Sequence, residues 1–246
     1  MTQLSLFEPP PIQPTAEMRG LASALLLPYQ VRVPVETGEA PEVVKALFKT
    51  IDSMYAYGRD GSVFERFLRV VDATLRRFED GEPDYMDAIK GMDRKALDLC
   101  AQGFGILLQH FWCDGGYADV LGPVYMEIRT NWKGSALGQF FTPWSLCKCM
   151  AYMQTDDELL ARIERGERVT VHDPACGSAA TLLAMRAAVA EKFGRQAADR
   201  LALYGQDIDQ TCVLMARIQC RMSNGWWMTN FQIASGFETA GMRRAA

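Results

Sequence analysis

The stretch Arg168-Val-Thr-Val-His-Asp-Pro-Ala-Cys-Gly-Ser178 decides the fold of this chain. Its first five residues alternate polar and apolar side chains, which is the pattern of a β-strand, and the strand ends at a turn of small residues. A helical pattern over 179–192 follows directly, and the short apolar run Leu201-Ala-Leu-Tyr204 predicts a second strand. Strand, helix and strand at this spacing predict a βαβ unit with two parallel strands.

The same alternation of elements extends in both directions. Downstream, the pattern predicts a helix over 210–222, stopped by Asn224-Gly225, and a last strand over 231–234. Upstream, Thr142-Pro143 predicts a helix start, with a capping hydroxyl and proline at the first helical position, and the helix runs to about Met153. The fold class is therefore α/β on the C-terminal side.

The segment before residue 130 has helical periodicity. The predicted pieces are a helix from about 41 to 55, a helix over 62–81 that opens with a capping box, a helical stretch over 85–112 broken near Gly103 and Gly105, a short helical turn over 119–125, and a loop over 131–139. These helices are amphipathic, so we expect them to pack on one another.

Composition excludes several classes of function. The 246 residues carry a net charge of −4 with 49% hydrophobic residues, values of a globular protein without a strongly cationic field for nucleic acid. No stretch is long enough for a membrane span, and the N-terminus lacks a signal peptide. Seven cysteines without framework spacing indicate a reduced, cytoplasmic chain. Two histidines and the tight Cys147-x-Cys149 pair predict no metal site.

The end of the first strand is the predicted binding place, because ligands of open parallel sheets lie outside the carboxyl ends of the strands. The turn 173–178 has no Lys of a phosphate-binding P-loop and too few glycines for a dinucleotide fingerprint. A nucleoside with an ammonium-carboxylate tail is therefore favoured over a phosphate ligand. Asp207, at the end of the second strand, is placed to accept both ribose hydroxyls.

Three ordered segments resemble motifs of adenine-specific (N-6) DNA methyltransferases: Gly138-Gln-Phe-Phe-Thr-Pro143, Asp173-Pro-Ala-Cys-Gly-Ser178 and Leu203-Tyr-Gly-Gln-Asp-Ile-Asp209. The modification subunit of type I restriction systems is the most similar member, and its linker resembles Asp119-Val-Leu-Gly-Pro-Val-Tyr125. The resemblance covers about residues 43 to 235 and implies S-adenosylmethionine as cofactor.

The resemblance assigns seven cofactor-binding residues. The family motif that closes over the methionine moiety matches Phe141, Thr142 and Pro143. The loop under that moiety matches Asp173, Ala175 and Gly177, and the ribose acceptor matches Asp207. It implies three parts of the chain: a flexible tail and lead-in over 1–40, a helical domain over 41–130, and a partial Rossmann-like methyltransferase domain over 131–246.

Four of these regions also have a purely structural interpretation. Phe140 and Phe141 suit core packing beside a helix start. Cys176 is expected to be a small buried residue rather than a nucleophile, and His172 a packed or hydrogen-bonded residue rather than a base. Trp226-Trp227 suits a base-stacking platform or, in preference, a packed interface.

Two departures from the family pattern concern the cofactor site. Ala179-Ala180 stands where a second glycine is usual, and Phe237 stands where a polar residue would face the adenine. Whether cofactor binding survives these changes is open at the level of sequence.

A third departure concerns catalysis. Adenine methylation needs Asn or Asp, then Pro-Pro, then an aromatic residue, to accept the amine hydrogens and stack on the flipped base. No proline follows Pro174, so the chain has no such tetrad in its place and no assigned catalytic residue.

Three functions remain compatible with the sequence. The first is the cofactor-binding half of a DNA adenine methyltransferase in a restriction-modification system, inactive alone and completed by a second chain. The second is a non-catalytic regulator or decoy that binds restriction-modification subunits, and the third is a fragment without cofactor. We expect DNA contact only within a complex, a second methyltransferase or specificity subunit as partner, and association, including a homo-oligomer, through an onward sheet edge near Trp226, Trp227 and Phe231.

Overall fold

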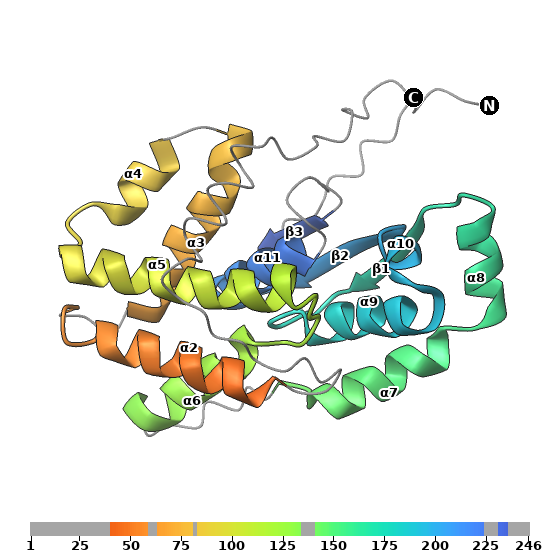
Figure 1. Ribbon diagram of the computed structural model, residues 1–246, viewed down its shortest axis with the longest axis horizontal. Coiled ribbons are helices and arrows are strands. Elements are labelled where there is room, and N and C mark those ends of the chain that lie inside the picture. Colours follow the sequence, from red (N-terminus) through yellow and green to blue (C-terminus); the bar gives the residue numbers. More distant parts are fainter. Residues whose placement is uncertain (1–39, 59–62, 81–82, 134–140, 224–230, 236–246) are drawn as a thin grey trace.

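The computed structural model describes residues 40–58, 63–80, 83–133, 141–223 and 231–235. Its elements, in chain order, are α2 (Pro41–Met54), α3 (Val63–Asp80), α4 (Pro83–Ile89), α5 (Arg94–Leu108), η1 (Gln109–Cys113), α6 (Leu121–Lys133), α7 (Trp144–Gln154), α8 (Asp157–Glu164), β1 (Val169–Asp173), α9 (Ala180–Phe193), α10 (Arg195–Ala198), β2 (Leu201–Asp207), α11 (Gln210–Ser223) and β3 (Phe231–Ser235). Figure 1 shows helices α2 to α6 gathered at one end and the sheet with α7 to α10 at the other.

The strands form one parallel sheet in the order β1-β2-β3. Val169 pairs with Leu201, and Leu203 pairs with Phe231. The α/β class predicted from the sequence is confirmed, and so is each of the three strands. β2 is longer than the predicted strand over 201–204, because it continues through Gly205 to Asp207. Both aspartates of the predicted site are therefore the last residues of their strands.

The two crossover helices cover the same face of the sheet. The strands advance in one direction from β1 to β3, and right-handed crossovers then place α9 and α11 on one side. Burial agrees, since Val169, Leu201 and Leu203 are buried whereas Thr170 and His172 are exposed. His172 was expected to be packed or hydrogen-bonded rather than a base, and the packed alternative is therefore wrong.

The strand order also locates the two sheet edges, which are β1 and β3 within the described residues. In a doubly wound sheet the chain returns from its third strand to the free side of the first. The edge to which a doubly wound sheet adds its next strand is that of β1. Phe231 lies in the other edge strand, β3, and the expected association near Phe231 stays a prediction. Trp226 and Trp227 lie outside the described residues.

The predicted break near Gly103 and Gly105 is also wrong. α5 runs through both glycines, and the helical stretch is instead interrupted at Gly91, whose φ is +72°. Gly103 is small for a packing reason, because a Cβ there would lie 2.8 Å from the ring of Phe67 in α3. A residue without a side chain lets helices of this region approach closely.

Helix α6 is longer than the predicted turn over 119–125, since it runs from Leu121 to Lys133. The predicted loop over 131–139 is therefore helical in its first part, and 134–139 lies outside the described residues. The predicted domain boundary at residue 130 falls inside α6 and stays a prediction. The sequence patterns also missed the two short helices α8 and α10.

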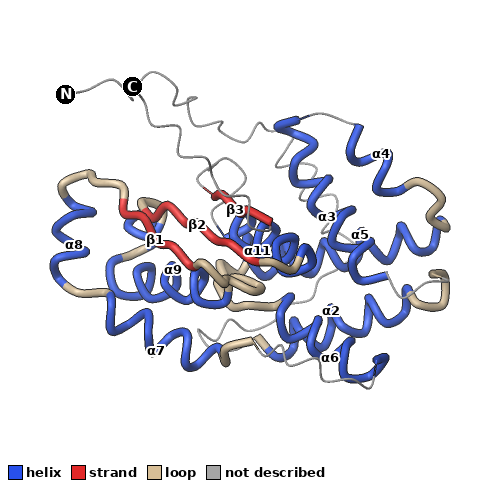
Figure 2. The backbone as a smooth tube through the Cα atoms, turned by 180° about the vertical axis from the view of Figure 1, so that it is seen from behind, coloured by secondary structure: helices blue, strands red, loops and turns tan. Residues whose placement is uncertain are grey.

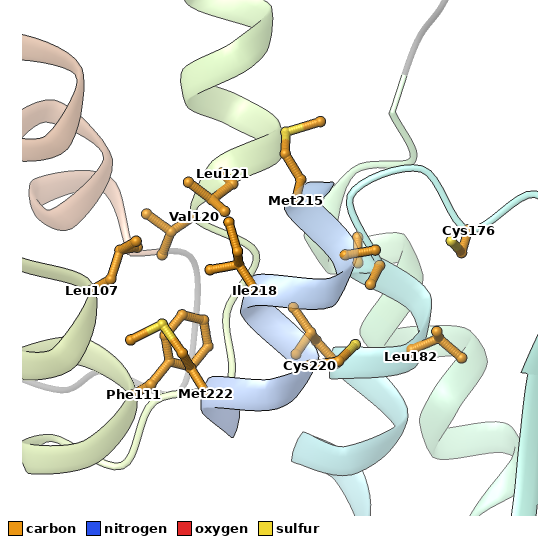
Figure 3. Packing of buried hydrophobic residues seen from close by; sticks show 14 of the residues in the cluster. Leu107, Phe111, Val120, Leu121, Cys176, Leu182, Met215, Ile218, Cys220 and Met222 are labelled. Carbon is orange, nitrogen blue, oxygen red and sulfur yellow. The ribbon is translucent and has the colours of Figure 1, made fainter. Parts of the chain in front are cut away.

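Helix α11 carries the core between the helical region and the sheet. Its buried side chains contact both sides: Figure 3 shows Ile218 and Met222 beside Leu107, Phe111 and Val120, and Cys220 on the side of Leu182. All of these residues belong to one continuous cluster of buried apolar side chains. Burial of this area is the main stabilising contribution that joins the N-terminal helices to the sheet. No helix of the described segments is both long and apolar enough to cross a membrane.

The short π-helix η1 contains a buried histidine, His110. Its ring packs edge-on against Phe111, at 4.8 Å between centroids, and a Cβ on Gly116 would lie 2.2 Å from its Cε1. Nε2 has no hydrogen-bond partner among the described residues. Burial lowers the pKa of His110 below its ordinary value of 6.5, and the Ala118 carbonyl and Asp114 act in the opposite direction.

This histidine predicts acid-dependent stability. Because the folded-state pKa is the lower one, the unfolded chain binds the proton first, and the contribution to stability is complete above pH 6.5 and decreases as the pH falls below it. The melting temperature of the wild type should therefore drop more steeply between pH 6.5 and about 5.5 than that of His110→Leu. Equal slopes in the wild type and His110→Leu would contradict the assignment.

Candidate functional site

The predicted site lies where β1 and β2 end side by side. Asp173 pairs with Gly205 in the sheet register, and Asp207 follows two residues later in β2. The loops after these strands lie between the sheet and the helices α2 and α6, as the centre of Figure 2 shows. This is the place that parallel sheets use for ligands.

The Asp207 carboxylate connects the two loops. Its Oδ2 accepts the backbone N–H of Gly177 at 2.9 Å, and its Oδ1 accepts the N–H of Asp209 at 2.9 Å. Each carboxylate oxygen has two lone pairs, so one acceptor position on each oxygen remains. The side chain is half-buried. The result is a fixed, partly solvent-facing pair of acceptors at the end of β2.

Asp173 has a different environment, because it holds the turn after β1. Its Oδ1 accepts the N–H of Ala175 at 3.0 Å, and its Oδ2 accepts the hydroxyl of Thr181 in α9. The turn is further fixed by the N–H of Cys176, which donates to the Gln206 carbonyl at 2.8 Å. Ala175 itself is exposed.

Phe141 lies directly against this turn. Gly177 has φ +54°, and a Cβ there would lie 2.9 Å from Cδ1 and Cε1 of the Phe141 ring. The ring of Tyr125 in α6 is 6.1 Å from that of Phe141 and 5.5 Å from that of Phe64 in α3. The residue predicted to cover the methionine end is thus positioned by aromatic side chains of the helical region.

Thr142 and Pro143 stand beside Phe141 but are exposed. The predicted helix start is off by one residue: α7 begins at Trp144, Pro143 is its N-cap, and no side chain caps it. The Thr142 carbonyl accepts the thiol of Cys147 at 3.6 Å. This hydrogen bond joins the backbone of the segment to helix α7.

A cavity of about 380 Å³ is lined in part by residues 141–144. Most of its lining is apolar, and it includes Val44 of α2, Met126 of α6, Phe141, Trp144 and the buried carboxyl of Asp119. The helical region and the sheet region therefore both contribute walls next to the Gly177 turn.

Cys176, which lies in the turn, is buried, as expected from the sequence. Burial raises the pKa of its thiol to about 12, with Asp173 and Asp207 acting in the same direction. Because the thiolate is the nucleophilic form, this cysteine is not equipped for nucleophilic chemistry at neutral pH. Among the described residues no cluster of three or more His, Cys, Asp or Glu side chains suits a metal ion.

One residue of the site was missed by the sequence patterns. Ile208 follows Asp207 and is 79% exposed, although it is a large aliphatic side chain. An exposed isoleucine at a strand end is a flat apolar surface beside the Asp207 acceptors. Its only signal in the sequence was its position between two aspartates after an apolar strand.

Comparison with known proteins agrees with this arrangement. Residues 117–238 match the family model for N-6 DNA methylases. The chain belongs to this family. The matched region begins just before α6 and includes β1, β2 and β3, and therefore the whole Asp173–Asp207 edge.

Two solved structures are similar to this chain at low sequence identity. A protein from Listeria monocytogenes assigned as a class I S-adenosylmethionine-dependent methyltransferase is 18% identical over 80% of this chain and 54% of its own, with a TM-score of 0.44. The methyltransferase subunit of a type I restriction-modification system from Streptococcus thermophilus is 15% identical over 93% of this chain and 45% of its own, with a TM-score of 0.38. This methylase-family chain thus spans about half the length of either protein. No curated protein matches it.

The contact of Gly177 with Phe141 predicts a specific loss of stability. Gly177→Ala places a residue with a Cβ at positive φ, at a cost of roughly 1–2 kcal/mol, and also moves the Phe141 ring. Gly166→Ala is the matched control, because Gly166 has φ +79° with no atom within 4 Å of the added Cβ. Urea denaturation should show a larger decrease in the free energy of unfolding for Gly177→Ala. An equal decrease would mean that the ring is not held against the turn.

Proposed function

We propose that this N-6 DNA methylase family member binds S-adenosylmethionine at the carboxyl ends of β1 and β2. The observation that supports this most directly is the Asp207 carboxylate, fixed by the N–H groups of Gly177 and Asp209 with an acceptor position left on each oxygen. Two acceptors at a fixed separation suit the two hydroxyls of a ribose.

The residues present fit the other parts of that cofactor. The exposed side chain of Ile208 offers an apolar face for the adenine ring next to the ribose position. Asp173, Ala175 and Gly177 form the floor for the methionine moiety, with Phe141, Thr142 and Pro143 beside it. When bound, the cofactor would supply a methyl group on a positively charged sulfur. The aspartates at positions 173, 207 and 209 favour such a cation.

Removal of the Asp207 carboxylate tests the site. Loss of hydrogen bonds to a charged group costs about 1.5–3 kcal/mol, so Asp207→Ala should weaken cofactor binding roughly ten- to a hundredfold in calorimetric titration. Asp199→Ala is the matched control, because Asp199 precedes the amino end of the same strand β2, away from the site. It should bind like the wild type.

Two results would overturn this assignment. One is a wild-type chain that does not bind at millimolar cofactor concentration. The other is identical binding by the wild type and Asp207→Ala. Either would favour a site that has lost its ligand, which is the outcome that Ala179 and Phe237 leave open.

We further propose that the chain supplies the cofactor-binding half of a DNA adenine (N-6) methyltransferase of a restriction-modification system. No proline follows Pro174 in its sequence, so the Asn/Asp-Pro-Pro-aromatic tetrad is not among its residues in the expected order. Without the tetrad there is no acceptor for the amine hydrogens and no ring to stack on the flipped adenine. We assign no catalytic residue, and residues outside this sequence would have to supply the tetrad.

The chain alone should therefore not methylate DNA. Purified protein is incubated with tritiated cofactor and unmethylated genomic DNA, and transfer of label to adenine is expected to equal that of a no-enzyme control. Label on adenine above that control would contradict the proposal. The control for protein integrity is cofactor binding by the same sample, which separates an inactive fold from an inactive site.

The sheet face opposite α9 and α11, together with the edge of β1, supports the proposal of a partner. Parallel sheets are normally covered on both faces. On the face opposite α9 and α11, Thr170, His172 and Gln206 are exposed in the described part of the chain, whereas Ala202 is buried, so this face is only partly covered. The free edge of β1 also offers unpaired backbone groups. We propose that a second methyltransferase or specificity subunit, or a further copy of the chain, packs here, and that DNA contact arises only within that complex.

The alternative role is a non-catalytic regulator or decoy that binds restriction-modification subunits through the same surface. The two roles differ in one result, since only the first predicts that a partner chain with the missing tetrad restores transfer of label. For either role we propose a cytoplasmic location, with which the seven cysteines agree, because all lie in described segments and none forms a disulfide.

A further inference from the structure

A buried polar cluster lies directly behind the cofactor turn. It consists of Asp119, before α6; Ser178, in the turn; and Gln219, in α11. The Ser178 hydroxyl donates to Oδ2 of Asp119 at 2.6 Å, and Nε2 of Gln219 donates to Oδ1 of Asp119 at 2.8 Å. Ser178 and Gln219 have no exposed surface and Asp119 is 8% exposed. Ser178 and Gln219 are therefore out of reach of an approaching cofactor, whereas Asp119 borders the cavity described above.

The same side chains also bind backbone groups of three segments. Nε2 of Gln219 donates to the Ser178 carbonyl at 2.8 Å, and its Oε1 accepts the N–H groups of Val120 and Leu121. Asp119 Oδ1 accepts the N–H of Gly122 at 2.9 Å. The cluster therefore joins the start of α6, the turn after β1, and α11.

Burial of the Asp119 carboxylate costs free energy that apolar packing at the same position would not cost. No cation is paired with Asp119 among the described residues, and a buried carboxylate is destabilising unless hydrogen bonds compensate it. Burial raises the pKa of Asp119, whereas the hydrogen bonds from Ser178, Gln219 and Gly122 lower it. A Cβ on Gly122 would lie 2.3 Å from Oδ2 of Asp119 and 2.6 Å from the Ser178 hydroxyl, so even a methyl group would displace the cluster.

Ser178 occupies a special position in the turn. It lies between Gly177, with φ +54°, and Ala179, with φ +79°. A non-glycine residue at positive φ costs roughly 1–2 kcal/mol and persists only where surrounding contacts hold it. Ser178 is held by its hydroxyl and by its carbonyl, and the adjacent Gly177 directs its N–H to Asp207.

We propose that Asp119 is a positioning residue for the cofactor site, which acts through Ser178 to hold the Gly177 turn on the Asp207 carboxylate. This inference rests on the proposed function of that turn in cofactor binding. It adds a link from the helical region to the site that none of the three recognised motifs contains.

Ser178→Ala removes the link with the smallest change of shape. Ser223→Ala is the matched control, because Ser223 is also a buried serine. Its hydroxyl donates to the Cys220 carbonyl and accepts a hydrogen bond from Arg186. Arg186 also donates to the Leu201 carbonyl, which places Ser223 near the amino end of β2. The control therefore loses a buried hydroxyl at the opposite end of the sheet. Both variants are compared with the full-length wild type by calorimetric titration with S-adenosylmethionine and by amide hydrogen exchange.

In Ser178→Ala, peptides that cover 174–182 should exchange faster and cofactor affinity should fall about three- to tenfold, as expected for one buried hydrogen bond. Ser223→Ala should change neither quantity, even where its melting temperature falls as much. Equal effects of the two variants would reduce the cluster to general stability and overturn the proposal.

A double variant tests the route through Ser178. If Asp119 acts through Ser178, the effects of Asp119→Asn and Ser178→Ala on exchange at 174–182 are not additive. Additive effects would overturn the route. The exchange measurement needs no ligand, so a wild type that does not bind cofactor would contradict the proposed function while exchange still decides whether Asp119 and Ser178 hold the turn.

Discussion

The hydrogen bonds of the Gln219 side-chain amide fix how the N-terminal helices lie against the sheet. The amide oxygen accepts two N–H groups at the start of α6, and the amide nitrogen donates to Asp119 and to the turn after β1. All of these groups are buried, so each would be an unsatisfied polar group without the amide, at about 1–3 kcal/mol each. Apolar burial alone would allow the N-terminal helices to pack on the sheet in several registers. The directed hydrogen bonds of one side chain select one of them.

This selection has a consequence for the site. The turn that ends at Ser178 is fixed from the inside by Asp119 and Gln219, and from the outside by Asp207, which accepts the Gly177 N–H. Asp207 can keep two acceptor positions toward solvent because it does not have to hold the turn alone. A site of this kind is organised before a ligand arrives, which reduces the entropy that binding must offset.

The sequence alone predicted the parallel sheet well. The first strand followed from alternation and the second from a short apolar run, and Asp173 and Asp207 followed from their places at strand ends, because these signals are local. The helical region was predicted less accurately. Gly103 suggested a break, since a glycine in an amphipathic pattern does not distinguish a helix end from a close contact, and only the position of Phe67 decides between them. Ile208 and the roles of Asp119 and Gln219 were not predicted, because exposure and hydrogen bonds between residues 100 apart in sequence have no local pattern.

The direction of the sheet indicates where the proposed partner would pack. Both crossover helices lie on one face, and the opposite face carries the exposed residues Thr170, His172 and Gln206 beside the buried Ala202. The edge that a doubly wound sheet extends next is that of β1, the strand that carries Asp173 at its end. A strand added there would end beside the same turn that Ser178 and Asp207 hold. Whatever group completes the reaction would therefore enter next to the proposed methyl donor, and it would meet a turn whose position is already set by the buried contact of Asp119 with Ser178.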